Sequence, residues 1–493
     1  MKPFNIKTYL KNHPKRIVVA SILFIWFYFC LPKPLFQIPT STVIESYDGK
    51  LLGAKIADDE QWRFPATDSV SYKFEQCLLN FEDQYFYNHI GFNPISMWNA
   101  VIQNSKANRV VRGGSTLTQQ VIRLSRKGKK RTYFEKLIEL ILATRLEFNK
   151  SKKEILNLYA SHAPFGGNVV GIDMAAWRYF GAPSNKLSWA ENATLAVLPN
   201  APSLIYPGKN QQRLLEKRNR LLKKLLSKNK IDTLTYELSI KESLPQKPFN
   251  LPQIAPHLLD FISKKNKGNR IQTTINYSLQ KQINNIVKRN YNILSQNEIR
   301  NMAVLVMDIK TREVKSYVGN TPTTKAHQKD VDIIQSGRST GSVLKPLLYS
   351  AMMDKGELLP EELVPDIPTV IAGYAPKNFS ETYNGAVPAN KALARSLNIP
   401  AVRLLQKYGL QRFSDEITAF KIRNIKYSAD HYGLSLILGG AEASLWDLCK
   451  TYAGLAGTLN HYTNSSSEYF TNEFIEPILL KGKKASFGNY TFE

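Results

Sequence analysis

The hydrophobic pattern changes along the chain, and this change limits most strongly how the chain can fold. Between residues 72 and 204, apolar residues recur every three or four positions, which is the period of an amphipathic helix. After residue 301 two short apolar runs, 303–308 and 313–318, flank a polar turn, as in a β-hairpin. Further helical segments are expected at 342–354, 388–407 and 443–458. The pattern therefore predicts a mainly α domain followed by an α+β domain.

The length of 493 residues exceeds that of one ordinary domain and favours two large domains with an anchor. A short hairpin is expected between Thr42 and Ile56, with Asp48 and Gly49 in its turn. The predicted segments are a cytoplasmic tail (1–16), a transmembrane anchor (17–31), a first domain (40–230), a linker (231–300) and a second domain (301–493). The linker is rich in Pro, Lys and Asn and is expected to contain helical pieces.

The predicted anchor is an apolar run of 15 residues from Ile17 to Leu31, after a tail with five Lys or Arg residues and no acid. A membrane span usually needs about 20 residues, but the flanking Lys15, Arg16 and Lys33 could extend towards the lipid headgroups. A cleaved signal peptide is the alternative, although no small-x-small cleavage site follows the run. We expect an uncleaved single-pass anchor with its amino terminus in the cytoplasm and the later domains outside.

The chain is strongly basic, with 66 Lys and Arg against 40 Asp and Glu and a formal net charge of +26. Such a charge favours nucleic acid, anionic lipid or a phosphate-bearing ligand as a partner. No zinc-finger spacing or RNA-recognition aromatic signature is present, so nucleic acid is not expected. The scattered Cys30, Cys77 and Cys449 argue against a disulfide framework and against a metal cluster.

Residues 209–230 contain nine cations and one acid, Glu216, with leucines repeating at helical spacing. The pattern predicts a surface helix that packs its leucines on the first domain. A basic amphipathic helix that also contacts anionic lipid remains the alternative.

Two glutamates, Glu82 and Glu139, lie in separate polar motifs, and six cations fall between Arg123 and Arg131. A carboxylate can take a proton from an attacking hydroxyl group, and cations can neutralise a departing pyrophosphate. Aromatic residues around Glu82 could raise its pKa towards neutral pH. The combination predicts chemistry on a sugar attached to a phosphate, with Glu82 as the base.

Four motif strings follow one another along the first domain: Glu82-Asp83-x-x-Phe86-x-x-His89-x-Gly91, Gly114-Ser115-Thr116-x-Thr118-Gln119-Gln120, Arg131 with Lys136-x-x-Glu139, and Glu154-Ile155-Leu156-x-Leu158-Tyr159. In order and spacing they resemble the motifs of the family-51 peptidoglycan glycosyltransferases. Two further strings, 163–167 and 196–203, are similar to the penicillin-binding protein 1C branch. The resemblance implies a lysozyme-like, mainly helical domain that polymerises lipid II into β-1,4 glycan.

By this resemblance, Glu82 is the general base for the acceptor's GlcNAc 4-hydroxyl, and Glu139 acts beside the donor's pyrophosphate. The implied substrate-binding residues are Asp83, His89, Ser115, Thr116, Gln119, Gln120, Arg123, Arg131 and Lys136. The resemblance implies no required cofactor and leaves room for a divalent cation, Mg²⁺ or Mn²⁺, at the pyrophosphate. One departure is Asn99, which stands where the family usually has an arginine.

A second pair of motifs lies in the second domain. Ser342-x-x-Lys345 places a nucleophile and an amine three residues apart, which on a helix would face the same way, and Ser396-x-Asn398 follows 54 residues later. Together they resemble the penicillin-binding transpeptidase fold, which is related to the β-lactamases. The resemblance implies that Ser342 is the nucleophile and that Lys345, Ser396 and Asn398 assist it.

The third motif of that fold, Lys-Thr-Gly on an edge strand, is not in the sequence. The nearest strings, 310–312 and 450–452, lack the glycine. The resemblance therefore implies a carboxyl-terminally shortened, incomplete transpeptidase domain, and we do not expect it to catalyse transpeptidation. A shortened gene product, a complementing second polypeptide and a domain retained only for packing all remain open.

Two other functions compete with polymerisation. Paired carboxylates also serve glycoside hydrolases, but a hydrolase of neutral glycan does not need the cations around Arg123. A non-catalytic cell-wall scaffold that retains the glycan-binding cleft is the alternative from a different class. The expected location is the inner (cytoplasmic) membrane with the catalytic domains periplasmic, and the expected partners are lipid II, nascent glycan, membrane lipid and other cell-wall synthesis proteins.

Overall fold

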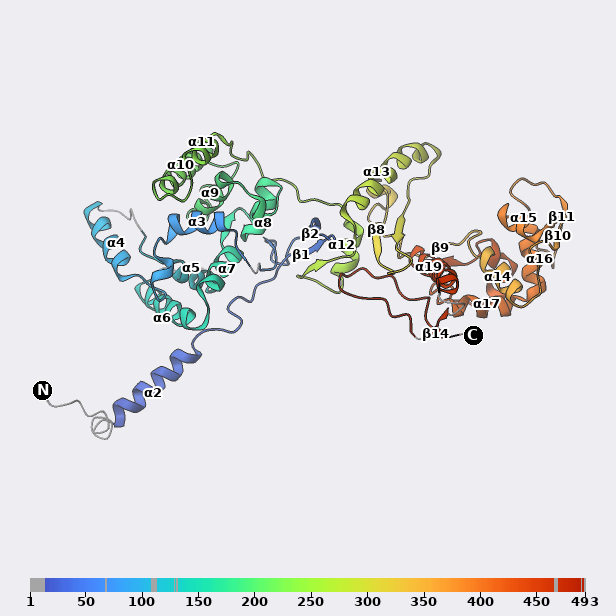
Figure 1. The fold of residues 1–493 in the computed structure, drawn as a ribbon, viewed down its shortest axis with the longest axis horizontal. Helices are drawn as coiled ribbons and strands as arrows, with labels where there is room; N and C mark the ends of the chain where they lie inside the picture. Colours follow the sequence, from blue (N-terminus) through green and yellow to red (C-terminus); the bar gives the residue numbers. More distant parts are fainter. Residues whose placement is uncertain are drawn as a thin grey trace. The chain divides into compact units, whose positions relative to one another are not determined.

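The computed structural model describes residues 14–66, 69–107, 113–127, 129, 132–464, 469–488 and 490–491. The chain divides into two compact units (Figure 1). The first comprises the described residues of Met1–Val43, Ala54–Pro252 and Ser263–Arg270, and the second those of Ile44–Gly53, Gln253–Ile262 and Ile271–Glu493. Each unit has its own fold, as the change of hydrophobic pattern predicted.

The first unit is mainly helical, which confirms the prediction for this part of the chain. Its helices are α2 (Pro14–Phe29), α3 (Tyr72–Glu82), α4 (Pro94–Ala107), α5 (Leu117–Ser125), α6 (Tyr133–Asn149), α7 (Lys152–His162), α8 (Ile172–Phe180), α9 (Trp189–Val197), α10 (Gln211–Ser227) and α11 (Thr233–Lys241). A small sheet of β3 (Trp62–Arg63), β5 (Val169–Val170) and β4 (Pro164–Gly166) accompanies them, with β3 parallel and β4 antiparallel to β5. The residues of α9 from Ala190 to Val197 are almost all buried, and α3, α10 and α11 pack against this helix.

Polar side chains fix where the helices of the first unit begin. Ser71, Thr116 and Thr132 each accept a hydrogen bond from the backbone N–H three residues later, and so cap α3, α5 and α6. Ser151 and Ser188 form complete capping boxes with Glu154 and Glu191. These caps set the starting residues of the helices that carry the sequence motifs.

The helix near the amino terminus, α2, has 16 residues and bears exposed apolar side chains such as Leu23, Phe24 and Trp26. Arg145 of α6 donates a hydrogen bond to the Tyr28 carbonyl (3.1 Å) and lies over the Tyr28 ring. Across the part of the chain that the structure describes, no helix is both long and apolar enough to cross a membrane. The expected span at 17–31 is therefore not confirmed.

The second unit mixes short strands with helices. Its helices are α12 (Pro256–Ser263), α13 (Tyr277–Leu294), α14 (Lys345–Asp354), α15 (Ala389–Ala394), α16 (Asn398–Tyr408), α17 (Leu410–Ala419), α18 (Ala429–Tyr432) and α19 (Leu445–Asn464). Two-stranded antiparallel sheets pair β7 (Val304–Met307) with β8 (Val314–Val318), β9 (Arg338–Ser339) with β12 (Glu442–Ala443), β10 (Leu363–Asp366) with β11 (Gly385–Pro388), and β13 (Tyr469–Phe470) with β14 (Tyr490–Thr491). The hairpin expected at 303–318 is thus confirmed.

A three-stranded sheet has the order β2 (Leu51–Lys55), β1 (Thr42–Glu45), β6 (Arg270–Gln272). Strands β1 and β2 form the hairpin predicted between residues 42 and 56. The interval 231–300, expected as a linker, is largely folded: it contains α11, α12, β6 and α13 and is shared between the two units. Its apolar residues explain this result, because Leu258, Leu259 and Ile262 of α12 are buried in a core with Ile44 and Leu52.

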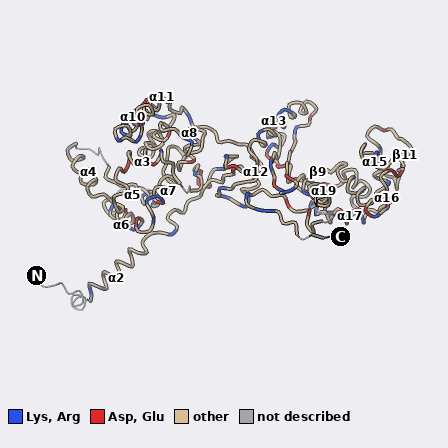
Figure 2. The backbone as a smooth tube through the Cα atoms, viewed as in Figure 1, with Lys and Arg blue, Asp and Glu red and all other residues tan. Residues whose placement is uncertain are grey.

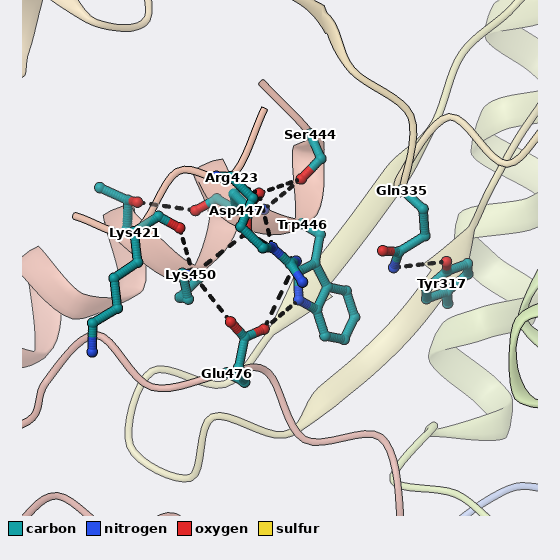
Figure 3. A network of polar contacts seen from close by, with 10 residues as sticks. Tyr317, Gln335, Lys421, Arg423, Ser444, Trp446, Asp447, Lys450 and Glu476 are labelled. Atoms are coloured by element: carbon teal, nitrogen blue, oxygen red, sulfur yellow. Dashed lines mark hydrogen bonds and ion pairs between the residues drawn. The ribbon is translucent and has the colours of Figure 1, made fainter. Parts of the chain in front are cut away.

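A network of polar contacts joins α19 to two neighbouring segments of the second unit (Figure 3). Lys450 is buried, and its ammonium group donates to the Lys421 carbonyl (3.0 Å) and to Glu476 (3.1 Å) and lies 3.4 Å from Asp447. Arg423 also pairs with Asp447, at 3.0 Å. Because a buried charge needs such partners, Lys450 stabilises the packing of α19 and does not take the place of an edge-strand lysine.

Candidate active site

The sequence motifs of the first unit meet around one cavity of about 980 Å³. Motif residues that line it are Glu82, Asp83, Ser115, Thr116, Gln120, Arg123, Lys136 and Glu139. They come from the end of α3, from the loop before α5, and from α5 and α6. Most of the surface of this cavity is polar, as a site for a sugar phosphate requires.

Glu82 is the last residue of α3 and contacts α5. Gln120 donates a hydrogen bond to Glu82 Oε2 at 2.8 Å. Burial raises the pKa of the Glu82 carboxyl, while the Gln120 hydrogen bond and the charges of Lys217 and Arg123 oppose the rise. A carboxylate whose pKa lies nearer to neutral pH is a better general base, because it retains more affinity for a proton when ionised.

Glu139 lies in the same cavity but in a cationic environment. Arg123 donates two hydrogen bonds to it, from Nε to Oε1 (2.9 Å) and from Nη2 to Oε2 (3.0 Å), and Lys136 Nζ lies 3.4 Å from Oε2. Burial disfavours the charge on Glu139, but the hydrogen bonds and charges of Arg123 and Lys136 outweigh burial and lower its pKa. Glu139 is therefore ionised and holds two cations in fixed positions.

The cation cluster has further polar partners. Lys136 Nζ donates to Ser115 Oγ and to Gln119 Oε1, both at 2.8 Å, and Arg123 Nη2 donates to Ser115 Oγ at 3.2 Å. The spacing of Lys136 and Glu139 predicted that they share a helix face, and they do. Two preorganised cations beside a hydroxyl group can bind and neutralise a diphosphate.

Asp83, His89 and Thr116, which are expected to bind substrate, also form hydrogen bonds within the protein. Asp83 Oδ2 accepts hydrogen bonds from the Leu117 N–H (2.9 Å) and from His89 Nε2 (3.0 Å). His89 Nδ1 accepts from the Gly91 N–H, so Nε2 carries the proton. Thr116 caps α5 and donates to the Gly91 carbonyl (2.7 Å). These residues hold the turn after Glu82 against the start of α5.

Some predicted residues are placed differently from expectation, and others are not placed. His89 is not among the described residues that line the cavity, and Gln119 is buried beneath it. Arg131 lies outside the described residues. The residues that line the cavity and that the motif analysis missed include Asn80, Asn200 and Lys224. The basic pattern of residues 209–230 predicted that Lys224 is a cation of a surface helix, but it did not predict that Lys224 lines this cavity.

The described residues do not fit a divalent cation at this site. Among them, no group of three or more His, Cys, Asp or Glu side chains is placed to hold a metal ion. The carboxylate of Glu139 accepts hydrogen bonds from Arg123, and that of Glu135 from Arg126. Each of these acids is therefore already neutralised by an arginine side chain.

The second unit brings three of its four motif residues together. Lys345 is buried at the start of α14, and its ammonium group donates to the Ser396 carbonyl (2.8 Å), to Ser396 Oγ (3.3 Å) and to Asn398 Oδ1 (2.7 Å). Burial lowers the pKa of Lys345 to about 8. Ser396 has a φ of 53°, a left-handed conformation that is unusual for serine.

Ser342 lies in the turn before α14 and not on the helix, contrary to the expectation that it shares a helical face with Lys345. Its carbonyl accepts from the Lys345 N–H (3.1 Å). None of the hydrogen bonds among the described residues joins Ser342 Oγ to the Lys345 ammonium group. Pro346 explains the difference, because proline favours the first turn of a helix and α14 begins at Lys345.

Two protein families match the two parts of the chain that contain these clusters. The Transglycosylase family matches residues 48–226, and the Penicillin binding protein transpeptidase domain matches residues 302–453. The chain belongs to the penicillin-binding proteins that join these two domains.

Within this class, the chain is similar to penicillin-binding protein 1C of Escherichia coli, with 36% identity over 432 residues that cover 86% of this chain and 55% of that protein. It is also similar to penicillin-binding protein 1B of Haemophilus influenzae, with 28% identity over 408 residues, 77% of this chain and 51% of that protein. The chain spans about half the length of these relatives. A crystal structure of penicillin-binding protein 1A from Haemophilus influenzae aligns with a TM-score of 0.45 at 18% identity, covering 92% of this chain and 72% of that chain.

Proposed function

We propose that this protein is a peptidoglycan glycosyltransferase that polymerises lipid II into β-1,4 glycan chains. The observation that carries this proposal is the shared cavity: Glu82, whose pKa is raised, and the Arg123–Lys136 cluster line the same space. A base and a diphosphate-binding cluster in one cavity suit the two ends of one sugar-transfer reaction.

In this reaction Glu82 accepts the proton of the acceptor's GlcNAc 4-hydroxyl, and the hydroxyl oxygen attacks the donor's anomeric carbon. The bond from that carbon to the diphosphate breaks, and the electron pair leaves with the lipid diphosphate. Arg123 and Lys136 stabilise the negative charge that develops on the leaving group. Attack from the face opposite the leaving group inverts the α-linked donor into a β-linkage.

We also propose that the protein acts at the inner membrane, anchored through the apolar segment 17–31 with its catalytic domains outside the cytoplasm. An apolar groove of about 540 Å³ between α4 and α6 supports this location, lined by Phe92, Pro94, Met97, Trp98, Leu140, Ile141 and Thr144. Exposed Tyr133 and Phe134 lie at the start of the same α6 helix. A lipid surface would cover apolar side chains that water otherwise contacts.

For the second unit we propose a transpeptidase-like fold without efficient acyl transfer. The Lys345 ammonium group is engaged by Ser396 and Asn398 and not by Ser342 Oγ, so the nucleophile lacks its activating contact. A non-catalytic cell-wall scaffold is the competing function for the whole chain.

Incubation of the full chain with labelled lipid II distinguishes these functions. Polymer formed by the wild type and not by Glu82→Gln supports the proposal. Cleaved fragments would indicate a hydrolase, and unchanged lipid II with retained binding would indicate a scaffold.

A further inference from the structure

The α10 helix carries several Lys and Arg residues (Figure 2), and two of them, Lys217 and Lys224, contact residues that line the cavity with Glu82. Lys217 Nζ donates a hydrogen bond to Asn200 Oδ1 at 2.9 Å, and Asn200 lines that cavity. Lys224 lines it as well, and its ammonium group donates to the Asn80 carbonyl. Lys217 and Lys224 are seven residues apart, two helical turns, and therefore share one face of α10.

The packing of α10 fixes where this face lies. Leu214, Leu221 and Leu225 are buried, and α10 packs against α3 and α9. Glu82 is the last residue of α3. The packing of these leucines therefore places Lys217 at the edge of the contact between α10 and α3. The Lys217 side chain is only partly exposed there.

The groups that face Glu82 come from several elements. Asp83 follows it in the chain, Gln120 and Arg123 belong to α5, Tyr159 belongs to α7, and Lys217 belongs to α10. Arg123 is already engaged by both carboxylate oxygens of Glu139. The Tyr159 hydroxyl is buried and neutral, because burial, with the nearby Glu82 charge, raises its pKa well above the ordinary value.

Lys217 is in a different situation from Arg123. Its hydrogen-bond partner Asn200 is neutral, and its other charged neighbours on α10, Arg213 and Arg220, are cations. Within the described residues no carboxylate forms an ion pair with Lys217, so its charge remains available to act on Glu82. The interaction favours the charged form of both groups.

We propose that Lys217 is a positioning residue: its ammonium group, fixed by Asn200 at the cavity wall, keeps the Glu82 carboxylate ionised when a sugar substrate displaces water. The inference rests on the proposed glycosyltransferase function and deepens it. Expulsion of water from a cavity disfavours an isolated carboxylate, and a fixed cation offsets this cost. Without this cation, a larger fraction of Glu82 would be protonated at acidic pH and unable to accept the proton of the acceptor.

The test is the pH dependence of polymerisation by the full chain with labelled lipid II in detergent micelles. Initial rates are measured from about pH 5 to 9 for the wild type, Lys217→Gln and Lys217→Arg, with Lys223→Gln as the matched control because Lys223 is an exposed cation of the same helix. Loss of the Lys217 charge raises the pKa of Glu82, so the acid limb of the profile should move to higher pH by roughly 0.5 to 1 unit.

The expected rate loss in Lys217→Gln is about three- to ten-fold on the acid limb and small on the alkaline plateau. Lys217→Arg, which keeps the charge, and Lys223→Gln should keep the wild-type limb. A purely structural role would lower the rate of Lys217→Gln equally at every pH and would overturn the inference, as would an unchanged profile.

A second readout separates this inference from the proposed function. Infrared spectroscopy without substrate follows the carboxylic acid band that is missing in Glu82→Gln, and this band should titrate at higher pH in Lys217→Gln than in the wild type. If the wild type formed no polymer, the proposed function would be wrong. The infrared titration would still show whether Lys217 affects the pKa of Glu82. An identical titration in both proteins would overturn the inference even if polymer formed.

Discussion

At the scale of single residues, two glutamates in one cavity have opposite environments. Glu82 is half-buried and accepts a hydrogen bond from an amide, whereas Glu139 accepts hydrogen bonds from a bidentate guanidinium and an ammonium group. Their pKa values are therefore shifted in opposite directions, upward for Glu82 and downward for Glu139. These opposite pKa shifts assign proton transfer to Glu82 and the positioning of Arg123 and Lys136 to Glu139.

Replacement of Glu139 by Gln should disrupt this organisation. It removes the charge that fixes Arg123 and Lys136, so we expect polymerisation to fall about 10²- to 10³-fold, as when a preorganised group at a developing charge is lost. Glu135→Gln is the matched control, because Glu135 lines the same cavity but pairs with Arg126. Steady-state polymerisation rates measure both. Equal losses in the two variants would contradict the assigned role of Glu139.

Asp83 should act through the fold and not through substrate binding. In Asp83→Asn the amide group lacks the charge that His89 and the Leu117 N–H now contact, so the free energy of unfolding should fall by about 1–3 kcal/mol. Urea denaturation measures this loss. Unchanged stability together with a raised KM for lipid II would show instead that Asp83 binds substrate, as the sequence resemblance implied.

At the scale of secondary-structure elements, the sequence gives the order of the motifs, but it does not give the orientation in which one helix packs against another. The i, i+3 spacing on α6 predicted the Lys136–Glu139 pair. In contrast, Lys224 reaches the Asn80 carbonyl across 144 positions of sequence. Such a contact depends on the orientation in which α10 packs against α3, and local periodicity does not determine this orientation.

The interval 231–300 shows the same limit. Its sequence indicated a connector with helical pieces, but not that α12 and α13 would contact residues of distant segments such as Ile44 and Tyr317. Composition describes local preference, and tertiary burial outweighs it.

Gly91 couples the turn after Glu82 to α6, the helix that carries Glu139. It has a φ of +97°, and a Cβ atom there would lie 2.7 Å from the Ala143 backbone carbon. Gly91→Ala should therefore lower the free energy of unfolding by at least about 2 kcal/mol and reduce polymerisation. Gly113→Ala is the control, because a Cβ atom at Gly113 meets no heavy atom within 4 Å. Thermal melting and polymerisation rates measure both, and a harmless Gly91→Ala would contradict the close approach.

At the scale of the whole molecule, each unit has its own core and its own polar cluster. The first unit contains the cavity with Glu82, and the second contains the Lys345–Ser396–Asn398 cluster. Neither string that resembles Lys-Thr-Gly fills the place of that motif: residues 450–452 belong to α19, and residues 310–312 lie in and next to the turn between β7 and β8.

The second unit should not form a stable acyl-enzyme. Full-length protein incubated with a fluorescent penicillin should show no covalent label after denaturing electrophoresis, because the Lys345 ammonium group does not contact Ser342 Oγ. Ser342→Ala should polymerise lipid II at the wild-type rate. Stable labelling of the wild type that disappears in Ser342→Ala would contradict this prediction.

The most direct test of the central claim is the initial rate of lipid II polymerisation by Glu82→Gln and wild-type protein at the optimal pH of the wild type. If Glu82 is the base, the rate should fall by about 10²- to 10⁴-fold while the melting temperature stays within a few degrees of the wild type. A folded Glu82→Gln protein that polymerises within ten-fold of the wild-type rate would contradict the account.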